Sequence, residues 1–180
     1  NGTTALHLAL ETLGIKEGDE VIAPDLTFAA TINAIIHARA TPVIVDIDEK
    51  TWNISETEIL KNITQKTKAI IVVHLYGNPF DVKSLKEKIP SDIFIIEDCA
   101  EAIGAKYNSE YVGTHGDASA FSFFGNKAIT TGEGGMVVFK DPKYTEKAKI
   151  LRDHGMSQSK KYYHEYIGFN YRMTNLQAAI

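Results

Sequence analysis

The sequence predicts one α/β domain built around a largely parallel sheet. Short apolar runs alternate with segments of helical periodicity along its 180 residues. Several runs are apolar without interruption, as in Ala69–Val73 (AIIVV), which is typical of parallel strands buried on both faces. With 44% hydrophobic and 23% charged residues, the chain has an ordinary composition and enough length for one substantial core. No repeat, low-complexity segment or linker divides residues 1–180.

The individual elements follow from apolar spacing and from start and stop signals. The first helix, Thr4–Leu13, has leucines at helical spacing and is followed by Gly14, a residue suited to a C-cap. The later predicted elements are, in order, strand Glu20–Ala23, helix Thr27–Ala38, strand Pro42–Val45, strand Lys68–Val73, helix Val82–Lys88, strand Ile93–Ile96, strands Ala118–Phe123 and Gly135–Phe139, and a helix from Pro142 to about Leu151. His154–Arg172 is predicted to be the longest loop, and such loops are usually functional or mobile.

Charge and composition exclude several classes of protein. The net charge is -4 with scattered Lys and Arg, which argues against a nucleic-acid partner. No apolar stretch approaches the roughly 20 residues that span a bilayer, so no membrane segment is predicted. The single cysteine, Cys99, cannot form an internal disulfide, which fits a reducing cytoplasm. The chain opens at the start of a helix and closes inside a helical pattern, so we expect a fragment of a longer protein.

Polar residues that follow the predicted strands are the first functional candidates, because sheets of this kind bind ligands beyond the carboxyl ends of their strands. Asp98 follows one strand directly and is either a functional carboxylate or a helix N-cap. His74 follows another strand, where a structural hydrogen-bonded histidine is the more frequent case. Cys99 has no sequence feature that activates it, so a buried structural thiol is favoured over a nucleophile.

The segment from Ser122 to Lys127 is the sharpest chemical signal. Ser122 lies near the end of a predicted strand, a Gly-Asn turn follows, and Lys127 comes directly after that turn and before a glycine cluster at 132–135. A lysine with a lowered pKa is a Schiff-base nucleophile, whereas a surface lysine beside a turn is the equally weighted alternative. At the other end, Thr3 and Thr4 open a helix, where phosphate can bind, although simple capping is the favoured interpretation from these residues alone.

The sequence lacks the motifs of other glycine-rich phosphate-binding sites and of common metal sites. The sequence has no G-x-x-x-x-G-K-[ST] and no G-x-G-x-x-G between a strand and a helix. Its six histidines form no H-E-x-x-H, and one cysteine cannot build a zinc cluster. No metal site is therefore predicted.

Six segments in order resemble the DegT/DnrJ/EryC1/StrS family of pyridoxal-phosphate (PLP)-dependent sugar aminotransferases over essentially the whole chain. These are NGTTALHLAL, PDLTFAATINAI, VHLYGNP, EDCAEAIGA, SFFGNKAITTGEGGM and GFNYRMTNLQAAI. FFGNK and ITTGEGG are most similar to the perosamine-synthetase branch. The resemblance implies the large domain of the type I (aspartate-aminotransferase-like) PLP-dependent transferases, a mostly parallel sheet flanked by helices. It also implies a fragment that lacks an N-terminal segment and a C-terminal small domain.

The resemblance implies a role for each matching residue. Lys127 matches the lysine that binds PLP covalently, and Asp98 matches the carboxylate that keeps the pyridine nitrogen protonated. Phe28 occupies the aromatic position that stacks on the cofactor ring. Thr3 and Thr4 match the phosphate-binding turn, so phosphate binding becomes the favoured reading there.

Four further positions complete the implied site. Ser122 matches a hydroxyl that also contacts the phosphate, and Glu101 lies where many relatives carry Gln near the 3-hydroxyl of PLP. A carboxylate would repel a phenolate there unless one of them is protonated. Asn170 matches a residue that reaches the phosphate of the neighbouring subunit, which implies a homodimer with shared active sites. Arg172 either binds a donor carboxylate or makes a structural ion pair.

The resemblance thus implies a cytoplasmic enzyme that moves the amino group of L-glutamate to a nucleotide-linked keto-deoxy sugar. GDP-4-keto-6-deoxymannose, which would yield GDP-perosamine, is the example that the branch suggests. Three rivals stay open: a sugar dehydratase of the same family, a non-catalytic or regulatory PLP-binding relative, and an unrelated nucleotide binder. In the dehydratases a histidine replaces the lysine, so Lys127 argues against that rival. The sugar, the nucleotide, the aminated carbon and the polysaccharide or metabolite pathway stay open as well.

Overall fold

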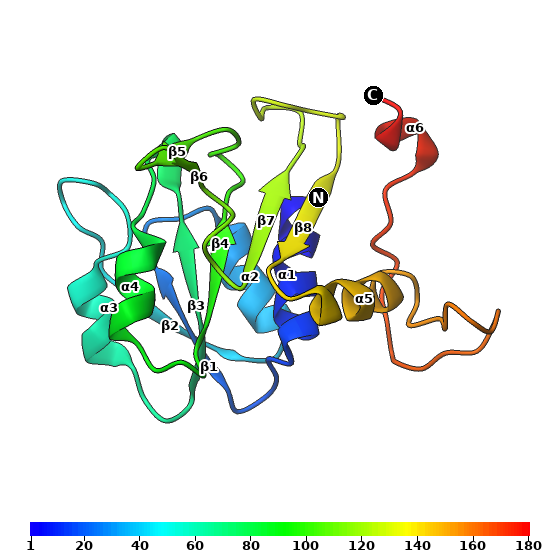
Figure 1. The fold of residues 1–180 in the computed structure, drawn as a ribbon, viewed down its shortest axis with the longest axis horizontal. Helices are drawn as coiled ribbons and strands as arrows, with labels where there is room; N and C mark the ends of the chain where they lie inside the picture. Colours follow the sequence, from blue (N-terminus) through cyan, green and yellow to red (C-terminus); the bar gives the residue numbers. More distant parts are fainter.

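A six-stranded sheet with the order β2-β1-β3-β4-β7-β8 forms the centre of the computed structural model, which describes residues 1–180 (Figure 1). All neighbouring strands are parallel except β7 and β8, which pair antiparallel at one edge. The strands are β1 (Glu20–Pro24), β2 (Thr41–Val45), β3 (Thr67–Val73), β4 (Phe94–Asp98), β7 (Ala118–Ser122) and β8 (Gly135–Phe139). A separate small hairpin joins β5 (Lys106–Tyr107) to β6 (Glu110–Tyr111).

Helices cover both faces of the sheet, as the apolar strands predict (Figure 1). On one face α1 packs against α2, α5 and strands β7 and β8. On the other face α3 and α4 pack onto side chains of β1, β3 and β4. The helices are α1 (Gly2–Leu13), α2 (Ala29–His37), α3 (Glu56–Asn62), α4 (Val82–Lys88), α5 (Pro142–Leu151) and α6 (Asn175–Ala178), with a 3-10 turn η1 (Leu75–Gly77) after β3. None of them is long and apolar enough to cross a membrane.

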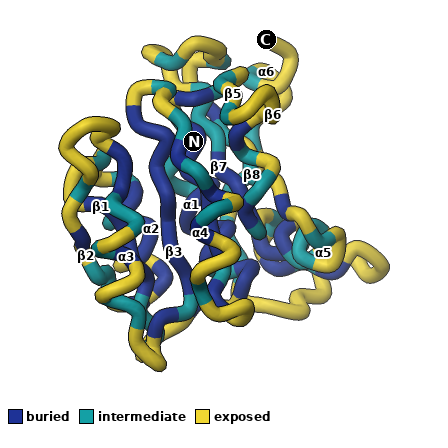
Figure 2. Tube along the Cα trace, turned by 60° about the vertical axis from the view of Figure 1, so that its left-hand side comes forward, coloured by how far each residue is buried: buried dark blue, intermediate teal, exposed yellow.

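The predicted burial of the strands is confirmed at the centre of the sheet and wrong at its edge. In β3, every residue from Ala69 to Val73 is buried, and Figure 2 shows the same strand as a continuous dark segment. In contrast, Ile44 of β2 is 54% exposed and only Val45 of that strand is fully buried. β2 is the terminal strand of the sheet, and its apolar sequence does not by itself ensure that other elements cover both of its faces.

Most predicted elements are confirmed within two residues at each end. The C-cap at Gly14 is confirmed, with φ of 87° in the left-handed region that glycine adopts without strain. Helix α3 was not predicted, although Ser55 accepts a hydrogen bond from the backbone N–H of Glu58 in the spacing typical of a helix start. The long connection is confirmed, since only isolated bridges lie between α5 and α6.

Candidate active site

A cavity of about 460 Å³ lies at the carboxyl ends of β3, β4 and β7, beside the first turn of α1. This is the edge of a parallel sheet where ligands bind. The cavity brings together most of the residues that the sequence singled out. Those lining it are Thr3, Phe28, Asp98, Glu101, Ser122 and Lys127.

Asp98 is the last residue of β4 and is almost fully buried, with 6% exposure. One carboxylate oxygen accepts a hydrogen bond from the Thr31 hydroxyl at 3.0 Å, and the other accepts one from the Ala100 N–H at 3.1 Å. Burial raises the pKa of Asp98 above its ordinary value, because those bonds only partly offset the lost solvation of the charge. Thr31 comes from α2 and was not predicted, since nothing local to its sequence marks it.

Lys127 reaches the same cavity from the turn after β7. Its backbone N–H donates to the carbonyl of Phe124 at 3.0 Å, which closes that turn. Its Nζ lies 3.5 Å from Oε1 of Glu101, so the two side chains form an ion pair. The second oxygen of Glu101 accepts a hydrogen bond from the backbone N–H of Tyr76 at 2.9 Å. The cavity therefore holds the Lys127 amine, its Glu101 partner and the buried Asp98 carboxylate.

The first turn of α1 approaches β7 closely at Gly2. A Cβ at this position would lie 2.9 Å from the Cβ of Ser122, so only glycine allows the approach. Thr3 lines the cavity here, but Thr4 does not. The Thr4 hydroxyl instead donates to the Asn1 carbonyl at 2.9 Å, and the Asn1 side chain caps the Thr4 N–H. The structure thus gives Thr4 the capping arrangement that the sequence left as an alternative.

Phe28 lies at the N-terminal end of α2 and is 77% exposed, an unusual state for a large apolar ring. It lines the cavity together with Thr27, whose hydroxyl lies 2.9 Å from that of Thr31. Because Thr31 donates to Asp98, Thr27 must donate to Thr31. Two hydrogen bonds, from Thr27 to Thr31 and from Thr31 to Asp98, therefore connect the start of α2, where Phe28 lies, with the buried carboxylate.

Asn170 and Arg172 lie outside this cavity. Both line a second cavity of about 550 Å³ between α1, β8 and the chain before α6. Arg172 donates to Asp153 at 3.0 Å, which favours the structural ion pair of the two roles that the sequence left open. Asn170 forms an isolated bridge with Asp153 and is not among the residues that line the first cavity.

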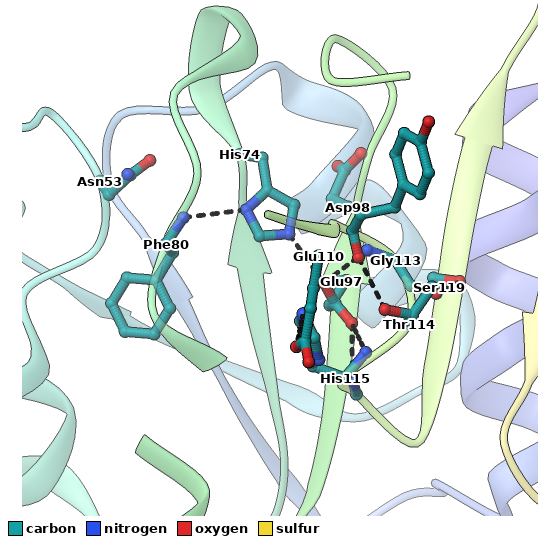
Figure 3. Close-up of polar contacts among 12 residues, drawn as sticks. Asn53, His74, Phe80, Glu97, Asp98, Glu110, Gly113, Thr114, His115 and Ser119 are labelled. Carbon is teal, nitrogen blue, oxygen red and sulfur yellow. Dashed lines mark hydrogen bonds and ion pairs between the residues drawn. The ribbon is translucent and has the colours of Figure 1, made fainter. Parts of the chain in front are cut away.

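His74 and Glu97 form a buried pair on the opposite face of the sheet, where Figure 3 shows their contacts. Nε2 of His74 lies 2.9 Å from Oε2 of Glu97, and neither side chain is exposed. Burial acts to raise the pKa of Glu97, but hydrogen bonds from His74 and from backbone N–H groups outweigh it and hold the pKa below its ordinary value. The structural role favoured for His74 is confirmed, whereas Glu97 was not predicted.

Cys99 is buried, as predicted, and burial raises the pKa of its thiol. Its sulfur lies within 4.8 Å of the ligand atoms of His74 and Glu97. A metal at this position would have to displace the hydrogen bond between His74 and Glu97. The thiol therefore belongs to the packing behind the cavity.

The sequence profile of the DegT/DnrJ/EryC1/StrS aminotransferase family matches residues 1–180. The chain belongs to this family. The GDP-perosamine synthase of Escherichia coli O157:H7 is 56% identical over 181 residues, covering 100% of this chain and 50% of that protein. The GDP-perosamine synthase of Vibrio cholerae is 48% identical, with 100% and 49% coverage. The chain thus spans about half the length of these relatives.

Solved structures agree with the family and with the fold. An aminotransferase from Psychrobacter cryohalolentis matches with a TM-score of 0.91 and 41% identity, covering 99% of this chain and 48% of that one. A Streptococcus pneumoniae structure described as the pyridoxamine-phosphate (PMP) form of a sugar aminotransferase matches with a TM-score of 0.92 and 33% identity, covering 99% and 50%. The predicted type I transferase fold is therefore confirmed.

Proposed function

We propose that this chain is the cofactor-binding part of an aminotransferase that uses PLP to move an amino group from L-glutamate to a nucleotide-linked keto-deoxy sugar. The observation that carries the proposal is the meeting of Lys127 and Asp98 in one cavity, delivered by neighbouring strands of the sheet. GDP-4-keto-6-deoxymannose is the substrate we propose, because relatives at 56% and 48% identity are GDP-perosamine synthases.

The residues of the cavity fit PLP in their chemistry. The buried Asp98 carboxylate accepts hydrogen bonds only from neutral donors, so a protonated pyridine nitrogen would give it a charged donor. The N-terminus of α1, with Thr3 and Ser122 beside it, would hold the phosphate through backbone N–H groups and hydroxyls. The exposed ring of Phe28 would cover one face of the cofactor.

Lys127 is the residue that would hold the cofactor and move the proton. When bound, PLP supplies a ring that accepts electrons as the α-carbon of the amino donor loses its proton. The Lys127 amine would hold the cofactor covalently until the amino donor displaces it, and the freed amine would then take the proton from the donor α-carbon and return it to the cofactor carbon. Asp98 would keep the ring nitrogen protonated, and Glu101 would stay beside the amine through its ion pair.

We further propose a cytoplasmic homodimer in which Asn170 reaches the cofactor phosphate of the second subunit. Its position outside its own cavity, on an exposed segment, is consistent with a role toward another copy. The free thiol of Cys99 is consistent with a reducing compartment.

The test is the first half-reaction, measured on the full-length protein loaded with PLP. We expect stoichiometric release of 2-oxoglutarate from L-glutamate without any sugar, and catalytic release once the correct nucleotide-linked keto sugar is added. Lys127→Ala should bind PLP but release no 2-oxoglutarate over many cycles, because it lacks the base. PLP binding by the natural protein without 2-oxoglutarate release would favour the non-catalytic relative.

A further inference from the structure

The hydrogen bonds of His74 fix which of its nitrogens carries the proton. Nδ1 lies 3.0 Å from the backbone N–H of Phe80, a group that can only donate, so Nδ1 accepts and carries no proton. Nε2 lies 2.9 Å from Oε2 of Glu97 and must be the donor to that carboxylate. Both contacts are dashed in Figure 3. The geometry therefore specifies a neutral imidazole with the proton on Nε2.

The first of these bonds closes the turn that follows β3. The backbone N–H of Gly77 donates to the His74 carbonyl at 3.2 Å, and the ring of the same histidine accepts from Phe80 three residues further on. Tyr76 lies between His74 and Gly77, and its φ of 51° is in the left-handed region. This conformation needs support from its surroundings, and His74 supplies it from both its backbone and its ring.

The turn 74–80 also reaches the cavity on the other side of the sheet. The backbone N–H of Tyr76 donates to Oε2 of Glu101 at 2.9 Å, and Oε1 of Glu101 lies 3.5 Å from Nζ of Lys127. Glu101 is itself partly exposed, and that N–H is its one fixed donor from the backbone. A displacement of the turn would therefore displace the carboxylate beside the lysine.

We propose that His74 is a positioning residue whose neutral ring holds the turn 74–80, and that this turn holds Glu101 against Lys127. This proposal rests on the proposed function. It states that a residue buried on the opposite face of the sheet keeps the side chains of the PLP site in place. Glu97 has a different task in this scheme. Its carboxylate accepts the hydrogen bond from Nε2 of His74, which keeps the proton on that nitrogen.

Two substitutions separate the two bonds of the ring. In His74→Asn the side-chain oxygen occupies the place of Nδ1, so the bond from Phe80 is kept and the bond to Glu97 is lost. In His74→Gln the side-chain NH₂ reaches toward Glu97, so that bond is kept while the buried Phe80 N–H loses its acceptor. Both variants lose one buried hydrogen bond, and both are expected to lower Tm.

The experiment measures the PLP dissociation constant of the full-length protein by cofactor absorbance, together with visible circular dichroism of the bound cofactor. We expect His74→Gln to weaken PLP binding about tenfold and His74→Asn to change it less than about twofold. Glu101→Ala, which removes the acceptor for the Tyr76 N–H, should also weaken binding. In the double variant His74→Gln/Glu101→Ala, the histidine change should add nothing, because its effect passes through Glu101.

A third variant changes the turn at an exposed residue, so that its effect on PLP binding can be measured without destabilising the core. Asn78 lies exposed on the same turn, and its side-chain NH₂ donates to the Thr51 carbonyl at 2.8 Å. Asn78→Ala should loosen the turn without touching the core and weaken PLP binding a few-fold, again only while Glu101 is present. Nitrogen NMR of the cofactor-free protein should show an unprotonated Nδ1 on His74.

The outcomes distinguish this proposal from the function on which it rests. If the natural protein binds no PLP, the proposed function is overturned and this proposal with it. If the natural protein binds PLP but the two His74 variants weaken binding equally, in proportion to their loss of Tm, only the positioning role is overturned. Additive effects in the Glu101→Ala background, or a proton found on Nδ1, overturn it as well.

Discussion

Two neighbouring acids on β4 have opposite surroundings. Successive side chains of a strand point to opposite faces, so Glu97 faces His74 and the loop 113–116, while Asp98 faces α2 and the cavity. Glu97 accepts four hydrogen bonds: from His74 at 2.9 Å and from the backbone N–H groups of Gly113, His115 and Gly116 at 2.7, 2.8 and 2.6 Å. Asp98 accepts two.

The difference in donors separates a structural acid from a functional one. Glu97 is fully supplied, and its pKa is held low, so its charge stabilises the fold. Asp98 is buried with too few donors, and its pKa is raised, so its charge costs stability until a cation arrives. A buried acid that faces a cavity and lacks donors is the stronger sign of a ligand site, because the fold alone gives no reason to keep it.

The largest expected effect is that of Asp98→Asn on turnover. Loss of the charge that keeps the ring nitrogen protonated should lower kcat about a thousandfold. The same change should leave Tm of the cofactor-free protein equal or higher, since an uncompensated buried charge is removed. Steady-state kinetics and calorimetry on the full-length protein check both. A large drop in Tm would mean that Asp98 is a structural acid like Glu97.

Glu97→Gln should show the reverse pattern. The amide can accept on one side only, so at least one buried N–H group loses its partner and the fold is destabilised by about 3 kcal/mol. Chemical denaturation measures the free energy of unfolding. Activity per folded, PLP-loaded molecule should fall far less than in Asp98→Asn. Equal losses of turnover in the two variants would contradict the division of roles.

The dependence of stability on pH should separate the two acids by sign. A lowered pKa in the folded state means that Glu97 stabilises the fold above its ordinary pKa of 4.5 and loses this as the pH falls through its folded value. A raised pKa means that Asp98 costs stability increasingly as the pH rises above its ordinary 3.8. In unfolding titrations, the deficit of Glu97→Gln and the gain of Asp98→Asn should therefore both shrink toward low pH.

A pair of serines on β7 offers the smallest and best matched contrast. Ser119 pairs with Glu97 across the sheet and donates to the Gly113 carbonyl at 2.8 Å, whereas Ser122 lies at the cavity. Ser122→Ala should weaken PLP binding roughly fivefold with little change in Tm. Ser119→Ala should lower Tm and leave PLP binding alone. Fluorescence titration with PLP compares the two, and a reversed result would place the phosphate elsewhere.

The sequence placed the cavity residues well because parallel strands bring their carboxyl ends to one edge. Asp98, Ser122 and Lys127 each follow or end a strand, so their meeting could be predicted without the structure. The role of Glu97 could not, because its donors come from a loop 16 to 19 residues further along the chain. The spacing of neighbouring residues does not predict contacts between segments so far apart in the sequence.

Two other points have local physical reasons. The phosphate contact that the resemblance implies for Thr4 stays a prediction, and its hydroxyl, at the third position of a helix, turns back to the capping residue Asn1. The edge strand β2 was expected to be buried because Pro42–Val45 is apolar, yet burial depends on which elements cover a strand. Apolar sequence alone does not state its position in the sheet.

The most direct test of the central claim is the location of the covalent bond to the cofactor. The full-length protein, saturated with PLP, is treated with borohydride, which reduces an imine to a stable amine, and the adduct is located by peptide mass spectrometry. We expect a phosphopyridoxyl group on Lys127, and none in Lys127→Ala. Folded, PLP-saturated protein in which Lys127 is unmodified would contradict it.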